Sequence, residues 1–404
     1  MDRRKLLTGM GATALASGRA RAAEAPAWLS PQLPEGTREE AALAALPGKK
    51  KLICLADRPP NYESPIETFR SAITPQDEFF VRYHLAGIPS MATLEDWSLS
   101  LGGDAAERRV VFKLEDLQRD FRHTEVTAVC QCSGNRRGLS EPHVAGVEWG
   151  YGGMGNATWR GPLLKDVLAK AGVGAGAVEV WLAGADGPAL PSTPGFQKSL
   201  PVEKVMGDEI ILAIAMNGAP LPLLNGFPVR LIVPGWTATY WMKHLNALTI
   251  SSKPLDNFWM KAAYRVPAGM FPVEHPFQSQ LTAVNWPITE IVVNSLIADP
   301  VAGTVQPGSG FTVQGVAWDR GHGIRTVEVS IDAGQTWKEA TLGADLGRFA
   351  FRAFSFRPGA LGPGNYVISS RATSNAGETQ AAQLKFNPAG YHNNVPQQIA
   401  VTVA

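Results

Sequence analysis

Short alternating segments separated by turns occupy the last part of the chain, and they restrict its fold more than any other feature. Beyond about residue 287, apolar and polar side chains alternate with the two-residue period of half-buried strands. Turn sequences such as D-A-G-Q at 332–335 lie between these segments. The pattern predicts an immunoglobulin-like β-sandwich over residues 287–404. Its expected strands cover residues 289–294, 310–318, 326–331, 349–356 and 365–373.

The preceding part of the chain is also rich in turns and shows few helical patterns. The 404 residues include 41 Gly and 30 Pro, and this length allows two or more domains. Short helices are expected at 114–121 and 163–171, and buried strands at 210–216 and 228–234. We therefore expect an α+β fold, in which a mixed, β-rich domain over residues 67–286 precedes the sandwich.

The N-terminal residues have the pattern of an export signal. Arg3 and Arg4 precede an apolar stretch at 6–16, and a small-x-small cleavage sequence, A-R-A, follows. We interpret residues 1–23 as a twin-arginine-type signal peptide; an ordinary secretory signal or a basic tail are the alternatives. Residues 24–66 are Pro-rich and are expected to form an irregular arm packed on the main domain; a disordered segment is the alternative. These features predict a periplasmic protein, and no other apolar run is long enough to span a bilayer.

Charge and cysteine content exclude several classes of protein. The chain has 37 basic and 36 acidic residues, which argues against nucleic-acid binding and against a polybasic membrane role. Its three cysteines are Cys54, Cys130 and Cys132, so at least one thiol is unpaired or has another use. No C-x-x-C-H sequence occurs, and we expect no covalently bound c-type haem in this chain.

Residues 128–138, A-V-C-Q-C-S-G-N-R-R-G, carry the pattern with the clearest chemistry. A strand-like alternation ends after Cys132 at the turn sequence S-G-N, and Arg136 and Arg137 follow. Neighbouring guanidinium groups lower the pKa of a thiol and favour the thiolate, which is the form that ligates metals. The same arginines could bind an oxyanion. The alternative is a buried structural cysteine followed by a basic turn.

Two other segments place charges where a strand is expected. In residues 79–84, Arg82 and His84 share one face of the predicted strand, which could instead be a solvated edge. Arg230 lies in an otherwise apolar strand and needs an anionic partner if it is buried. That partner could be a carboxylate of the protein or the phosphate of a cofactor.

The sequence C-S-G-N-R-R-G resembles the molybdenum-ligating motif of the sulfite oxidase/sulfite dehydrogenase family. The resemblance extends from about residue 67 to the C-terminus, and it is greatest to the bacterial, periplasmic, haem-free branch. Several motifs in a fixed order are more specific than one. The further segments that resemble the family are F-F-V-R-Y-H at 79–84, W-G-Y-G-G-M-G-N-A-T-W-R-G at 149–161, M-N-G-A-P-L-P at 216–222, G-F-P-V-R-L-I-V-P-G at 226–235 and V-E-V-S-I-D-A-G-Q-T-W at 327–337.

The resemblance implies a mononuclear molybdenum–molybdopterin centre with Cys132 as its protein ligand. It places the substrate anion at Arg82, Arg137, Trp149 and Tyr264, of which the two arginines and the tyrosine are implied to be catalytic. Trp149 could instead be a core aromatic residue. The cofactor contacts that it implies are His84, Asp186, Asn225, Arg230 and Lys243.

The sequence also departs from the family pattern. Asn225 stands where many relatives carry a histidine. Ala145, Ala263 and Ala389 stand where some relatives have charged pocket residues. We therefore expect a pocket that carries less charge than theirs.

The implied function is oxidation of sulfite to sulfate, with electrons passed to an external c-type cytochrome. We expect the cytochrome to dock near the pocket mouth, with Arg136 as a candidate charge on the rim; internal packing of Arg136 is the alternative. A homodimer or a heterodimer with a cytochrome subunit is the expected assembly. The alternatives are a related molybdenum subunit that acts on sulfane sulfur or a sulfoxide, and a cofactor-free exported binding protein.

Overall fold

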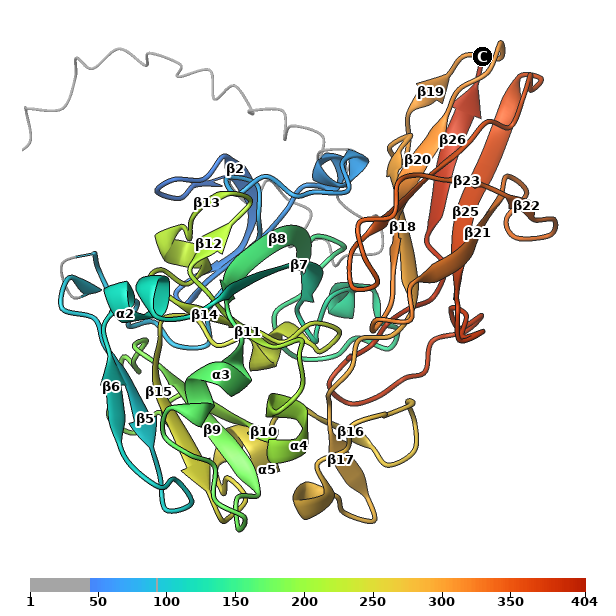
Figure 1. Cartoon of the computed structure of the whole chain (residues 1–404). Helices are drawn as coiled ribbons and strands as arrows, with labels where there is room; N and C mark the ends of the chain where they lie inside the picture. Colours follow the sequence, from blue (N-terminus) through green and yellow to red (C-terminus); the bar gives the residue numbers. More distant parts are fainter. Residues whose placement is uncertain (1–43, 92–93) are drawn as a thin grey trace, which may run out of the picture.

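The structure is a computed structural model that describes residues 44–91 and 94–404. Figure 1 shows a β-rich unit with several small sheets and short helices, coloured blue to yellow, beside a β-sandwich coloured orange to red. The predicted signal peptide and the first part of the predicted arm lie outside the described residues. Within the described part of the chain, no helix is long and apolar enough to cross a membrane.

Two sheets form most of the first unit. One runs in the order β13-β12-β8-β7, from β7 (His123–Gln131), β8 (Met154–Pro162), β12 (Ala215–Met216) and β13 (Ala219–Pro220). The other runs in the order β10-β9-β15-β5-β6, from β5 (Leu99–Gly102), β6 (Val110–Phe112), β9 (Glu179–Gly184), β10 (Gln197–Pro201) and β15 (Leu245–Ser251). Two-stranded sheets pair β11 (Ile211–Ala213) with β14 (Arg230–Ile232), and β16 (Arg265–Pro267) with β17 (Asn285–Pro287). The strands expected at 210–216 and 228–234 are thus present, in shorter form.

The antiparallel pair of β7 and β8 brings the cysteine motif into the core. Its register runs from His123 opposite Pro162 to Gln131 opposite Met154, and Cys130 faces Gly155. A Cβ atom on Gly155 would lie 2.5 Å from the ring of Phe79, so only glycine leaves room for that ring. Phe79 in turn packs edge-on against Trp159.

The helices are short and lie between strands, as the sequence predicted. The expected helices at 114–121 and 163–171 form as α2 (Leu114–Arg119) and α3 (Leu164–Ala169). Each buries an apolar face, with Leu117 on α2 and Leu168 on α3 fully buried. The other helical segments are α4 (Val202–Val205), α5 (Phe258–Lys261), η1 (Ile66–Arg70), η3 (Arg137–Leu139), η4 (Leu223–Asn225), η5 (Ala238–Tyr240) and η6 (Gln278–Gln280).

The described end of the predicted arm is regular structure, which corrects the expectation of an irregular segment. A four-stranded sheet runs in the order β1-β2-β3-β4. Leu52 and Tyr62 from this segment are buried against Val81 and Tyr83, so burial of an apolar face makes the hairpin stable here. The strand expected at 79–84 is reduced to β4. The bounds are β1 (Ala44–Ala45), β2 (Lys51–Asp57), β3 (Pro60–Glu63) and β4 (Val81–Arg82).

The C-terminal unit is the predicted β-sandwich. Its sheets run in the orders β18-β20-β24-β23 and β19-β26-β25-β21-β22, and Val313, Val329 and Ile368 from both sheets meet in its core. The first sheet contains β18 (Asn294–Asp299), β20 (Val313–Trp318), β23 (Thr341–Leu342) and β24 (Arg352–Phe356). The second contains β19 (Val305–Gln306), β21 (Ile324–Ser330), β22 (Lys338–Glu339), β25 (Gly364–Ser374) and β26 (Gln398–Val403). Strand β26 was not predicted from the sequence.

The strand expected at 289–294 is wrong: the sandwich begins at Asn294 instead. Residues 289–291 pair with the first unit. Thr237 donates its backbone N–H to the Thr289 carbonyl (2.9 Å), and Ile291 donates to the Gly235 carbonyl (2.9 Å). Tertiary pairing therefore uses this segment to join the two units, and the alternation of its side chains does not reveal that pairing.

Candidate active site

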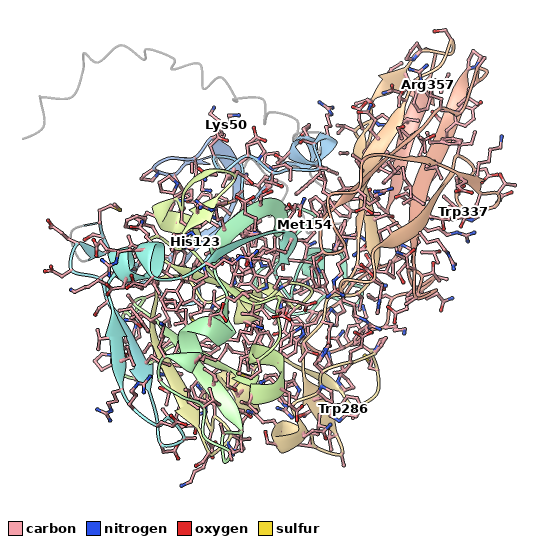
Figure 2. The ribbon with its side chains drawn as sticks, viewed as in Figure 1. Lys50, His123, Met154, Trp286, Trp337 and Arg357 are labelled. Carbon is pink, nitrogen blue, oxygen red and sulfur yellow. The ribbon has the colours of Figure 1, made fainter. Side chains whose placement is uncertain are left out.

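Cys132 is the first residue after β7 and lies in a turn that several hydrogen bonds hold. The Cys132 N–H donates to the Gly153 carbonyl (2.8 Å), and the Cys132 carbonyl accepts from the Asn135 N–H (3.0 Å). The Asn135 side chain accepts from the Gly153 N–H (3.0 Å). In Figure 2, His123 and Met154 mark the two ends of the β7–β8 pair, and Cys132 lies beyond the end that Met154 marks.

A pocket opens beside Cys132 and collects most of the predicted site residues. They arrive from segments far apart in the sequence, including the end of β7, the end of β4, the start of β14 and the stretch before β16. Cys130 does not line the pocket; it is fully buried behind it. The predicted residues that line it are Arg82, His84, Cys132, Asp186, Asn225, Arg230, Lys243 and Tyr264.

Arg82, His84 and Tyr264 form a hydrogen-bonded group on this pocket. Arg82 donates from Nη2 to the Tyr264 hydroxyl (3.4 Å), which also contacts His84 Nε2. The His84 ring stacks on Phe196 with 3.7 Å between ring centroids. Tyr264 has φ of 60°, an uncommon conformation for a non-glycine residue, so the surrounding packing fixes its direction.

Burial keeps both His84 and Tyr264 neutral. Burial, followed by the charges of Arg82 and Lys243, holds the pKa of His84 well below its usual value. Burial also raises the pKa of the Tyr264 phenol. At neutral pH the group therefore presents one guanidinium charge, one neutral imidazole and one phenolic O–H.

Arg137 does not line the pocket itself, but its guanidinium lies against the Cys132 turn. Arg137 donates from Nε to the Ala389 carbonyl (2.7 Å) and from Nη1 to the Val147 carbonyl (3.1 Å). A Cβ atom on Gly134 would lie 2.7 Å from its Nη2, so the glycine two residues after Cys132 makes room for the charge. No described residue accepts a hydrogen bond from Nη2, which leaves that nitrogen available for an anion.

Arg136 corrects the prediction of a charge on the pocket rim. Its side chain is only 1% exposed, and it donates from Nη2 to the Ser295 carbonyl (2.6 Å) and from Nη1 to the Val395 carbonyl (3.0 Å). Arg136 has φ of 68°, which turns it away from the direction of Arg137. Arg136 therefore fastens the first unit to the sandwich.

Trp149 also lies elsewhere than the resemblance implied. It is fully buried and does not line the pocket. Its ring packs edge-on against Phe80, with 6.1 Å between centroids, and Phe80 is a wall of the pocket. The structure places Trp149 in the core, which was the alternative interpretation.

Arg230 and Lys243 supply buried positive charge. Arg230 donates from Nη1 to the Asn225 carbonyl (3.1 Å) and from Nη2 to the Cys130 sulfur (3.2 Å). No described carboxylate pairs with it, which removes the protein salt bridge considered as an alternative. Lys243 donates from Nζ to the Arg82 carbonyl, and burial with the charge of Arg230 lowers the pKa of Lys243 to about 7. Burial raises the pKa of Asp186, the acidic residue nearby.

Lys49 holds Asn225 in place, and it was not among the site residues predicted from the sequence. The Lys49 Nζ donates to Asn225 Oδ1 (2.5 Å), and Asn225 Nδ2 donates to the Phe80 carbonyl (3.2 Å). Two further carbonyls, of Gln76 and Phe79, accept from the same ammonium group. A lysine inside the run G-K-K-K reads as solvent-exposed, so no sequence signal marked it.

Buried polar atoms without partners test whether the pocket suits an anionic cofactor. Ser133 Oγ, Thr239 Oγ1 and Arg230 Nε belong to residues that line the pocket, and none has a hydrogen-bond partner among the described residues. Buried polar atoms are nearly always hydrogen-bonded in folded proteins. Together with the charge of Arg230, these three atoms fit a phosphate or another polar group of a bound pterin. Ser133 adjoins Cys132 and could have been found, whereas nothing in the sequence singled out Thr239.

Two family descriptions match most of the chain. Residues 85–259 match "Oxidoreductase molybdopterin binding domain", and residues 285–403 match "Mo-co oxidoreductase dimerisation domain". The second description applies to the sandwich and supports its assignment as a separate domain.

Named relatives agree with these descriptions. The chain is 32% identical to the mitochondrial sulfite oxidase of Rattus norvegicus over 302 residues, 71% of this chain and 52% of that protein. It is 30% identical to the NADH nitrate reductase 2 of Phaseolus vulgaris over 332 residues, 76% of this chain and 36% of that protein. The chain thus spans about half the length, or less, of these curated relatives.

A solved structure matches over most of both chains. The sulfane dehydrogenase SoxCD from Paracoccus pantotrophus superposes with a TM-score of 0.73 and 28% identity, over 85% of each chain. Together with the Cys132 pocket, the unpartnered polar atoms and the C-terminal sandwich, these similarities show that the chain belongs to the sulfite oxidase family of molybdopterin-binding oxidoreductases.

Proposed function

We propose that the protein is a sulfite dehydrogenase, in which sulfite gains one oxygen from water and releases two electrons and two protons. The observation that carries the proposal is the convergence of Arg82, Arg137 and Tyr264 around the Cys132 turn. Two guanidinium groups and a phenol suit a small, doubly charged oxyanion, because charge-assisted hydrogen bonds to its oxygens are strong and directional.

The cofactor would lie in the pocket that these residues line. Cys132 would ligate molybdenum, and Arg230, Lys243, Asn225, Asp186 and His84 would hold the pterin. When bound, the molybdenum group supplies the oxygen transfer and stores the two electrons. The side chains of the chain provide binding, orientation and electrostatics.

Arg82 and Arg137 orient the anion, and Tyr264 completes its hydrogen bonding. Arg82 Nη2 already donates to the Tyr264 phenol oxygen, so the phenolic proton is directed to another acceptor. His84 Nε2 lies at that hydroxyl and is held neutral. Tyr264 can therefore donate to His84 or to a substrate oxygen without losing its proton.

Oxidation of sulfane sulfur is the second candidate, and the similarity to SoxCD favours it. The available Nη2 of Arg137 favours the small anion instead, because a protein-bound sulfane carries less charge at the reacting sulfur. A cofactor-free binding role gains no support from the pocket, whose unpartnered donors suit a polar cofactor.

The electron acceptor, assembly and location belong to the same proposal. We infer that a c-type cytochrome takes the electrons, one at a time, after each oxidation of sulfite. The match of residues 285–403 to a dimerisation domain supports a homodimer, and a heterodimer with a cytochrome subunit is the alternative. The export-signal pattern at the N-terminus supports a periplasmic location.

Steady-state turnover tests the proposal directly. Protein produced with the cofactor available should contain molybdenum and oxidise sulfite with ferricyanide or cytochrome c as acceptor. Thiosulfate and a persulfide-carrying protein, each tested at the same concentration, serve as the sulfane substrates. Turnover of a sulfane substrate without turnover of sulfite would replace the proposal by the second candidate.

A further inference from the structure

A short segment of the C-terminal domain reaches the proposed anion site. Residues 387–392 follow β25 and precede β26, and Asn387 shapes them into a closed loop. The Asn387 side chain accepts from the Tyr391 N–H (3.0 Å) and donates to the Tyr391 carbonyl (2.8 Å). Both polar groups of the Tyr391 backbone are therefore fixed, and the direction of its side chain follows from the loop.

Two residues of the proposed substrate site contact the Tyr391 ring. The rings of Tyr391 and Tyr264 lie nearly parallel, at an interplanar angle of 10° with 5.8 Å between centroids. The Arg137 guanidinium lies over the Tyr391 ring, 5.3 Å from its centroid. One aromatic side chain thus packs against both the phenol and the guanidinium that are proposed to bind sulfite.

The two residues before Tyr391 contact Arg137 as well. The Ala389 carbonyl accepts from Arg137 Nε (2.7 Å). Gly390 has φ of 60°, and a Cβ atom there would lie 2.8 Å from Arg137 Cγ. Position 389 therefore acts through its backbone, although its side chain is only a methyl group.

We propose that Tyr391 is a positioning residue of the anion site, whose ring holds Arg137 and Tyr264 at the orientation that binds the substrate. The inference rests on the proposed function, because it assigns the two contacts to sulfite binding. A flat ring restricts both partners by stacking and by cation–π attraction. The hydroxyl of Tyr391 has no hydrogen-bond partner among the described residues and is not needed for this role.

Two substitutions separate the ring from the hydroxyl. Tyr391→Phe keeps the ring and should leave the sulfite KM within about twofold of the wild-type value. Tyr391→Leu removes the ring, and the sulfite KM should rise by about three- to thirtyfold, with kcat changed far less. If Tyr391→Leu does not fold, Tyr391→Met offers a more flexible side chain of similar volume, which can fill the gap left by the ring, and it carries the same expectation.

A binding measurement without turnover accompanies the kinetics. Sulfate is the product of the proposed reaction, so it should raise the melting temperature of the wild type and of Tyr391→Phe equally, and that of Tyr391→Leu less. Tyr366→Leu, at a tyrosine of the sandwich that packs beside its own core, is the matched control. Molybdenum content is measured for every variant.

The outcomes distinguish the two proposals. An unchanged sulfite KM in Tyr391→Leu overturns the positioning role, and so does an equal loss in Tyr391→Phe, which would assign the effect to the hydroxyl. Absence of sulfite turnover in the wild type would reject the proposed function instead. The sulfate-dependent melting shift would then still report whether the Tyr391 ring organises an anion site.

Discussion

Cys130 is in β7 and Cys132 is the first residue after it, yet only Cys132 lines the pocket. The Cys130 thiol is fully buried and accepts a hydrogen bond from Arg230. Cys132→Ser should abolish sulfite oxidation, since a neutral hydroxyl is a much poorer metal ligand than a thiolate. Cys130→Ser, the matched control, keeps an acceptor for Arg230 and should retain turnover. Activity and molybdenum content are measured together, and full turnover in the Cys132 variant would refute the ligand assignment.

Arg82 and Arg137 offer the second test at the level of single residues. Replacing either by Ala should raise the sulfite KM strongly, and inhibition by sulfate should weaken in parallel. A lost charge-assisted hydrogen bond costs about 1.5–3 kcal/mol, or roughly ten- to a hundredfold. Arg325→Ala removes an exposed arginine of the sandwich and is the control for charge. A sulfite KM equal to that of the control would show that the substituted arginine does not bind the substrate and has only a structural role.

Arg136 and Arg137 show that the role of a single residue cannot always be predicted from its neighbours in the sequence. The sequence identified both as neighbours of the thiol, but it could not separate an anion ligand from a fastener between domains. The left-handed backbone at Arg136 sends its guanidinium to the carbonyls of Ser295 and Val395, far along the chain. Such partners belong to the tertiary fold, which no local pattern encodes.

Among the elements, the alternation of apolar and polar residues was sufficient to predict a strand where that strand buries one face. Alternation placed β20, β21 and β25 correctly because their inward residues form the sandwich core. It failed at residues 289–294, which have the same alternation but pair with the Gly235 turn. It also missed β2 and β3, since a Pro-rich sequence hides the few apolar residues that bury against β4.

The hairpin of β2 and β3 leads to a prediction about pH. Glu63 ends β3, is 2% exposed and accepts from the Gly150 N–H (2.8 Å), close behind the Cys132 turn. Burial raises the pKa of Glu63 from an ordinary value of 4.5 to about 8. Between these values the native state keeps a proton that the unfolded state releases, so stability should fall as pH rises from about 5 to about 8.

Glu63→Gln tests this dependence, because it keeps a neutral side chain of the same shape. Its melting temperature should change less with pH than that of the wild type, and the two curves should diverge most near pH 8. Glu115→Gln, at an exposed position on α2, is the control. Parallel curves for the wild type and Glu63→Gln would show that Glu63 is ionised in the native protein at neutral pH.

For the whole molecule, the pocket is an assembly of distant segments. Arg82 comes from the sheet of β1 to β4, Cys132 from the turn after β7, and Tyr264 from the stretch before β16. The loop at Tyr391 does not line the pocket but packs against Tyr264. Most of these residues were identified through the resemblance to a family. Composition and periodicity alone would not have identified them. The C-terminal domain therefore contacts two residues of the proposed site as well as matching a dimerisation domain.

Electron exit is the prediction that depends on the molecule as a whole. In the proposed function, the two electrons from each sulfite would leave one at a time to a c-type cytochrome. The formal net charge of the chain is +1, so long-range steering should be weak. Because Arg136 is internal, docking must rely on other groups around the pocket mouth. Redox encounters of this kind usually have small interfaces and associate quickly.

Stopped-flow mixing of sulfite-reduced enzyme with purified cytochrome c, over about 10–200 mM salt, measures this step. The second-order rate constant should be high and should fall only severalfold across the series, since local charges, and no strong overall field, guide the encounter. The rate constant of Arg136→Lys should decrease with salt concentration with the same slope as that of the wild type, because a buried side chain contributes nothing to docking. A steeper salt dependence in the wild type than in Arg136→Lys would show that Arg136 takes part in docking. Slow reduction at every salt concentration, beside rapid turnover with ferricyanide, would reject the cytochrome as the direct acceptor.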